Sequence, residues 1–241
     1  MTPYEVFLKV FRPDREERRR RIKREVDFML PSMTMVKACQ AYEFDFFMPL
    51  IDKGIITAQQ MHHAAQRYYL GKSKSGKPIF WMIDDMMTPL DALIGSDVWI
   101  STLLKNREPL LQYWIVKHCL FGLHLICDSD DMPVSIVESE RSALILSELF
   151  PENIWLAVMS ASYFTIDLLK PLVGRKIKVF PDTDVTMSNY VNWLDLAKMA
   201  HDKYHIDIGV SYYLEEHATA EQKERKIDLV DFIIESRSKS T

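Results

Sequence analysis

Three acidic side chains follow two short apolar segments that are predicted to be strands. Glu138 directly follows the segment at 134–137, and Asp182 and Asp184 come just after the segment at 176–180. If these strands are parallel neighbours, their carboxyl ends meet at one edge of the sheet, where functional groups of open α/β folds lie. Residues two apart in an extended chain point the same way, so Asp182 and Asp184 can face one ion.

Three carboxylates at this distance repel one another and raise each other's pKa, and a divalent cation relieves that repulsion. Mg²⁺ prefers hard oxygen ligands, so the pattern predicts a site for Mg²⁺ (or Mn²⁺) built by Glu138, Asp182 and Asp184. A second interpretation requires no metal. Glu138 can be an acid favoured by a helix N-terminus, and the two aspartates can be turn residues after a strand.

The elements that position these acids are predicted from about Cys119 onward, where short apolar runs alternate with amphipathic runs. This alternation is typical of βαβ units around a buried parallel sheet. Strands are expected near 134–137, 154–158 and 176–180, and helices near 140–150, 163–170 and 189–204. The fold class is therefore α/β, with a Rossmann-like parallel sheet flanked by helices.

The N-terminal region is predicted to be mainly helical with a short hairpin, which divides the chain into regions 1–94 and 95–241. The hairpin turn carries three candidate phosphate contacts: Lys72, Lys74 and Lys77. Its spacing is not that of a Walker loop. Four consecutive arginines at 18–21 point all round a helix, which favours a solvated face over a phosphate-binding stripe.

Composition limits the possible functions. The net charge is -4, so contact with nucleic acid must come from local basic patches. The three cysteines favour a reducing compartment, and no C-x-x-C pair suggests a zinc ribbon. No apolar run reaches the roughly 18 residues of a membrane span, and the first residues lack a secretory signal. We expect a cytoplasmic protein without a membrane partner.

Two segments also carry a family resemblance, VSIVESERSA at 134–143 and KIKVFPDTD at 176–184. They resemble the signature segments of the toprim fold of primases, topoisomerases, recombination proteins and some nucleases. The wider match, over roughly residues 60 to 235, is to a toprim-containing family of bacterial mobile elements. It also draws on YYLGKSKSG at 68–76, HCLFGLHLI at 118–126 and PENIWLA at 151–157.

The resemblance implies that Glu138 acts as a general acid or base or helps to hold metal, and that Asp182 and Asp184 bind Mg²⁺. It also implies that Arg141 contacts nucleic acid, although lysine is usual at that position. The turn AVMSAS at 157–162 lacks the glycines usual in the family.

The function implied is Mg²⁺-dependent action on DNA or RNA, most like a primase, during replication or mobilisation of an element. Replication or mobilisation proteins are the implied partners. A toprim-type nuclease and a catalytically inactive nucleic-acid-binding accessory module are the alternatives.

Overall fold

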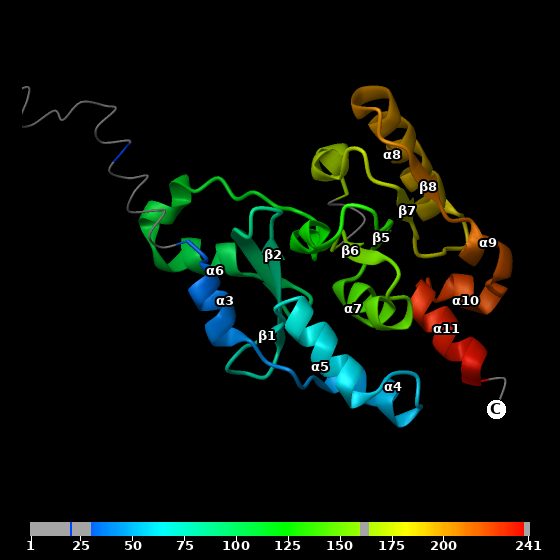
Figure 1. Cartoon of the computed structure of the whole chain (residues 1–241), viewed down its shortest axis with the longest axis horizontal. Helices are drawn as coiled ribbons and strands as arrows, with labels where there is room; N and C mark the ends of the chain where they lie inside the picture. The colour runs from blue at the N-terminus through cyan, green and yellow to red at the C-terminus, as the bar shows by residue number, and fades with distance from the viewer. Residues whose placement is uncertain (1–19, 21–29, 160–163, 239–241) are drawn as a thin grey trace, which may run out of the picture.

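The computed structural model describes residue 20 and residues 30–159 and 164–238. The predictions for the arginine run at 18–21, apart from Arg20, and for the end of the turn at 157–162 lie outside the described residues. Within the described ranges the chain builds two four-stranded sheets, one antiparallel and one parallel (Figure 1).

The parallel sheet has the strand order β6-β5-β7-β8, and all three neighbouring pairs are parallel. Its strands are β5 (Val134–Val137), β6 (Ile154–Ala157), β7 (Ile177–Val179) and β8 (Ile208–Val210). Every residue of β5 and β6 is buried, as expected for strands covered on both faces. The predicted α/β class with a parallel sheet flanked by helices is confirmed.

Helices cover the two faces of the parallel sheet. In the view of Figure 1, α7 and α11 lie below the sheet and α8 lies above it. These helices are α7 (Glu140–Leu149), α8 (Ser188–Tyr204) and α11 (Leu229–Ser238), with the short helices α9 (Tyr213–His217) and α10 (Ala220–Glu224) before α11. The helix expected at 163–170 is instead the 3-10 helix η5 (Ile166–Leu172), which contains Pro171. Proline removes a backbone donor that an α-helix needs.

The antiparallel sheet has the order β1-β2-β3-β4. Its strands are β1 (Gly71–Lys72), β2 (Pro78–Ile83), β3 (Pro89–Ile94) and β4 (Val98–Trp99). The turn at 73–77 closes a hairpin between β1 and β2, as the sequence predicts. Because β4 pairs with β3, this sheet continues past residue 94. Two helical elements follow it, α6 (Ile100–Arg107) and η2 (Pro109–Tyr113).

The described part of the N-terminal region is helical up to β1. It contains α3 (Met33–Cys39), η1 (Asp45–Phe47), α4 (Met48–Asp52) and α5 (Ala58–Arg67). Thr57 caps α5 in a reciprocal capping box with Gln60, which explains why this helix begins at Ala58.

One hydrophobic core joins the N-terminal helices to the parallel sheet. The core runs from Phe44 to Val230 and includes residues of α5, β2, β5 and β6. Tyr68, at the end of α5, is fully buried and donates a hydrogen bond of 2.7 Å to the carbonyl of Trp155 on β6. Gly122, the N-cap of η3 (Leu123–Asp128), packs against the Tyr68 ring. A Cβ there would lie 2.8 Å from a ring carbon of Tyr68, and φ is +82°, so only glycine fits without a shift.

Across the described residues, no helix combines the length and the apolar character needed to cross a membrane.

Candidate active site: a carboxyl cluster between the two sheets

Glu138 and Asp182 line the same cavity at the carboxyl edge of the parallel sheet. Glu138 is the first residue after β5, and its carbonyl accepts a hydrogen bond of 2.9 Å from the backbone N–H of Met159. The chain after β7 is held to β5 by a 2.8 Å bond from the N–H of Phe180 to the carbonyl of Ile136. These backbone bonds fix the two strand ends beside one another, so two of the three predicted acids come together.

The cavity has a volume of about 410 Å³ and lies between the two sheets. The antiparallel sheet contributes Phe80 of β2, Leu93 of β3 and the turn residue Gly95. The acids are therefore not on an open sheet edge. They lie under a wall that comes from a separate part of the chain, and this wall limits their contact with water.

Asp182 and Glu138 form a coupled carboxyl pair. Burial, the negative charge of Glu138 and the charge of Asp228 raise the pKa of Asp182 to about 9, and its side chain hydrogen-bonds to Glu138. At neutral pH Asp182 therefore favours its protonated form, in which its carboxyl group can donate a hydrogen bond to Glu138. Like charges in contact cannot both ionise without a compensating cation.

Glu140 is a third carboxyl group in this cavity, and no role for it was predicted from the sequence. It is only 7% exposed, lines the same cavity, and its Oε1 is buried without a hydrogen-bond partner among the described residues. Burial raises its pKa to about 7, against smaller opposing effects of its own backbone N–H and of Arg141. The signal was present in the sequence, because Glu140 stands two residues after Glu138 at the first position of α7.

Asp184 has a different environment from Asp182. One carboxylate oxygen accepts bonds of 2.8 Å from the N–H and 2.5 Å from the hydroxyl of Thr186. The other accepts bonds of 3.0 Å from Ser188 and 2.9 Å from the N–H of Asn189. Burial alone would raise the pKa of Asp184, but these bonds outweigh it and hold the pKa well below its usual range. Asp184 thus satisfies the donors at the start of α8.

Thr183, the residue between the two aspartates, anchors the segment that carries them. Thr183 is fully buried, its N–H donates to the carbonyl of Ile227, and its hydroxyl donates to Glu215 at 2.8 Å. The segment is therefore anchored on the α9–α11 side of the chain and is not a continuation of β7. Within the described ranges, no group of three or more His, Cys, Asp or Glu side chains is arranged to hold a metal ion.

Of the four basic residues predicted to contact nucleic acid, only Arg141 lines the cavity that holds the acids. Arg141 is exposed and lines the cavity, with its guanidinium carbon 5.2 Å from the centre of the Phe46 ring. Lys77 is not among the lining residues but lies next to Gly95, which is: its Cδ is 3.4 Å from where a Cβ on Gly95 would be. Lys72 lies over the ring of Phe44 at 5.0 Å, and Lys74 is exposed in the hairpin turn.

Comparison with known proteins gives one family match. Residues 92–183 match the family described as Domain of unknown function (DUF6371). The matched segment begins in β3 and contains Glu138, Glu140 and Asp182, whereas Asp184 lies just beyond it. No curated protein and no solved structure matches the chain.

Proposed function

We propose that this chain is a metal-dependent nucleic-acid-processing protein of the toprim type, with Glu138 and Asp182 as its metal-binding pair. The observation that supports it is the convergence of these two carboxyl groups in one cavity at the carboxyl edge of a parallel sheet, where burial and the charge of Glu138 raise the pKa of Asp182. Two carboxyl groups that repel each other when both are ionised can be bound by a divalent cation, because the cation offsets that repulsion.

The donor set fits Mg²⁺ in a restricted way. Mg²⁺ is commonly bound by one or two carboxylates, with waters and substrate phosphates completing its octahedron. Glu138 and Asp182 can supply those two carboxylates. Each carboxylate oxygen of Asp184 already accepts two hydrogen bonds from the protein. We therefore assign Asp184 to the positioning of α8. The bound cation supplies a Lewis acid that polarises a phosphoryl oxygen.

The chain's own residues have complementary roles in this proposal. Arg141 presents an exposed guanidinium at the cavity, where it can bind a phosphate of DNA or RNA. Glu138 accepts the proton of an attacking hydroxyl. Glu140, with a pKa raised to about 7, can hold or release a proton near neutral pH in the same cavity. The wall formed by Phe80 and Leu93 limits the access of water to these groups.

The leading activity is primase-like nucleotidyl transfer during replication or mobilisation of an element, and a nuclease would use the same acids. The commitment of Asp184 to the start of α8 favours a second candidate from another class. If the cation site lacks this aspartate and does not support catalysis, the chain is a nucleic-acid-binding accessory module with no enzymatic activity.

The test is Mg²⁺ and Mn²⁺ binding by calorimetry, without and with single-stranded DNA or RNA, followed by primer-synthesis and cleavage assays. We expect one site in the wild type, with proton release on binding, and loss of that site in Asp182→Asn. Asp184→Asn should keep the site if it remains folded, and Asp195→Asn, an exposed acid on α8, is the matched control. A folded wild-type protein that binds no cation in either state would refute metal dependence and leave the accessory module.

A further inference from the structure

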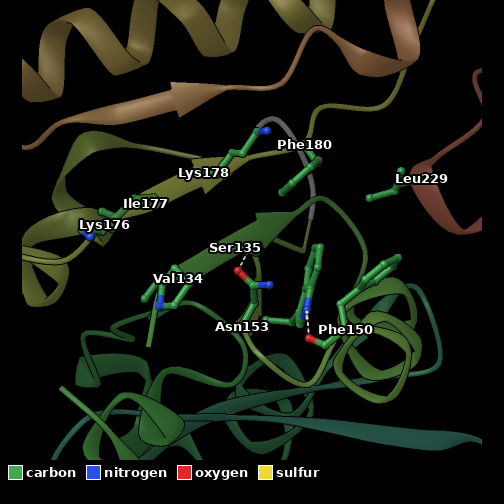
Figure 2. A pocket seen from close by; sticks show the side chains of 11 residues that line it. Val134, Ser135, Phe150, Asn153, Lys176, Ile177, Lys178, Phe180 and Leu229 are labelled. Carbon is green, nitrogen blue, oxygen red and sulfur yellow. Dashed lines mark hydrogen bonds between the residues drawn. The ribbon is translucent and has the colours of Figure 1, made fainter. Parts of the chain in front are cut away.

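A second cavity lies along one face of the parallel sheet, and none of its lining residues belongs to the carboxyl cluster. It has a volume of about 450 Å³. Figure 2 shows that Lys176 lies at one end of it and Phe150 and Leu229 lie at the other. Its floor is the sheet itself. Because alternate residues of a strand share a face, Lys176, Lys178 and Phe180 all project from β7 and its flanks to this side.

Aromatic rings form one part of the cavity. Trp155 on β6 and Phe180 after β7 have ring centres 5.4 Å apart, and Phe150 lies 6.2 Å from Trp155. The indole N–H of Trp155 donates to the carbonyl of Phe150 at 3.0 Å, which holds the ring in a fixed orientation. Phe150 is 36% exposed and Phe180 is partly exposed, whereas Trp155 is only 3% exposed and supports the other two rings from behind. Such surfaces stack on planar aromatic ligands.

Positive charge forms the other part. Lys176 and Lys178 are exposed, and in the described part of the chain neither forms an ion pair with an acidic side chain. The Nζ of Lys178 lies 5.4 Å from the centre of the Phe180 ring, so the charge and the ring are adjacent. The residues that line the cavity include no aspartate or glutamate. On a chain with a net charge of -4, this is a local basic site.

A polar pair completes the lining. The hydroxyl of Ser135 on β5 donates to Oδ1 of Asn153 at 3.2 Å, which fixes the orientation of that amide. The NH₂ group of Asn153 makes no hydrogen bond within the described ranges, so it remains able to donate to a ligand. A mostly apolar cavity of several hundred cubic ångströms with a few fixed polar groups is the usual form of a small-molecule site.

We propose that this cavity binds a nucleotide, with the base against the partly exposed rings of Phe180 and Phe150 and the phosphate at Lys176 and Lys178. The combination of an aromatic surface, adjacent unpaired cations and an amide donor matches the base, the phosphate and the hydrogen-bonding edge of one nucleotide. The nucleotide can be a free mononucleotide or one unit of a single strand. The proposal does not rest on the carboxyl cluster, because none of these residues belongs to it.

The experiment measures binding of AMP, ATP and a short single-stranded oligodeoxynucleotide in EDTA, so that no divalent cation contributes. The variants are Lys176→Ala/Lys178→Ala and Phe180→Leu, and the control is Lys198→Ala, an exposed lysine on α8. We expect wild-type binding to weaken by about tenfold in each test variant and to remain unchanged in the control. Asp182→Asn should bind as the wild type does, which separates this site from the metal site.

The two sources of a nucleotide are distinguished by the probes. Binding of AMP and ATP alone identifies a mononucleotide site. Oligonucleotide binding that weakens steeply with salt identifies a single-strand site, and either result supports the proposal. Three results would overturn it: no binding of any probe to the wild type, binding that both test variants retain in full, or a wild-type dimer that the Phe180 variant dissociates. The last result would identify the cavity as an interface between copies of the chain.

Discussion

Replacement of Asp182 by asparagine directly tests whether Asp182 holds a proton beside Glu138 at neutral pH. The pKa of Asp182 is about 9 in the folded protein, against an ordinary value of 3.8. Between these pH values the folded chain holds about one proton more than the unfolded chain. The stability from this group is therefore complete below pH 3.8 and is lost as the pH rises toward 9.

The magnitude follows from proton linkage. One extra bound proton lowers the free energy of unfolding by about 1.4 kcal/mol for each pH unit. From pH 6 to pH 8 the wild type should lose about 3 kcal/mol from this pair alone. Asp182→Asn removes this proton, and its side-chain amide can still donate a hydrogen bond to Glu138. The variant should therefore lack this slope and exceed the wild type in stability above neutral pH.

The assay is urea denaturation without divalent cations at half-unit steps between pH 5.5 and pH 8.5, for both proteins and for the control Asp195→Asn. Other titrating groups, including Glu140, are present in the wild type, the variant and the control. The difference in pH dependence between the wild type and Asp182→Asn therefore reports the proton on Asp182. Parallel curves across this range would show that Asp182 is ionised in the folded protein, and the coupled pair would have to be abandoned.

Three further changes test other features. Asp184→Ala should cost about 2 kcal/mol or more of unfolding free energy, because it removes four hydrogen bonds, two from Thr186 in the turn before α8 and two from the first residues of α8. An unchanged urea midpoint would contradict this role. Gly122→Ala should lower the free energy of unfolding, measured by thermal denaturation, by about 1–3 kcal/mol, because the added Cβ contacts buried core atoms. Gly54 also has a positive φ but lies in open space, so Gly54→Ala should cost less. A thiol reagent should label Cys127, which is exposed, in the folded protein, and should label Cys119, whose pKa burial raises, only after unfolding; equal rates would contradict the burial pattern.

The elements of the parallel sheet could be predicted because their signals are local and strong. Continuous apolar runs predicted β5, β6 and β7, and the amphipathic run at 189–204 predicted α8, within a residue or two. The antiparallel strand β3 was not predicted, because Pro89 opens it and Gly95 follows it, and both residues suggest irregular structure.

The site was predictable only in part, for a physical reason. The convergence of Glu138 and Asp182 follows from parallel strands ending at one edge. The role of Asp184 does not, because its carboxylate accepts hydrogen bonds from Thr186, Ser188 and Asn189, and the period-two rule does not include these partners. Thr183 is anchored to Glu215 and Ile227, which are distant in sequence, so tertiary contacts fix the segment that carries both aspartates. The burial of Glu140 likewise depends on the wall that the antiparallel sheet provides.

The strand order has a consequence for synthesis of the chain. β5 lies between β6 and β7 but is made before both, so its two edges wait for partners that emerge later. The β5–α7–β6 unit closes over a short stretch, whereas β8 adds its edge to β7 only after α8 has been made. A nascent chain stalled before β7 therefore exposes one unpaired edge of β5, a strand that is buried throughout in the folded chain. Such edges pair readily with other chains, so slow translation between 158 and 176 should favour aggregation over folding.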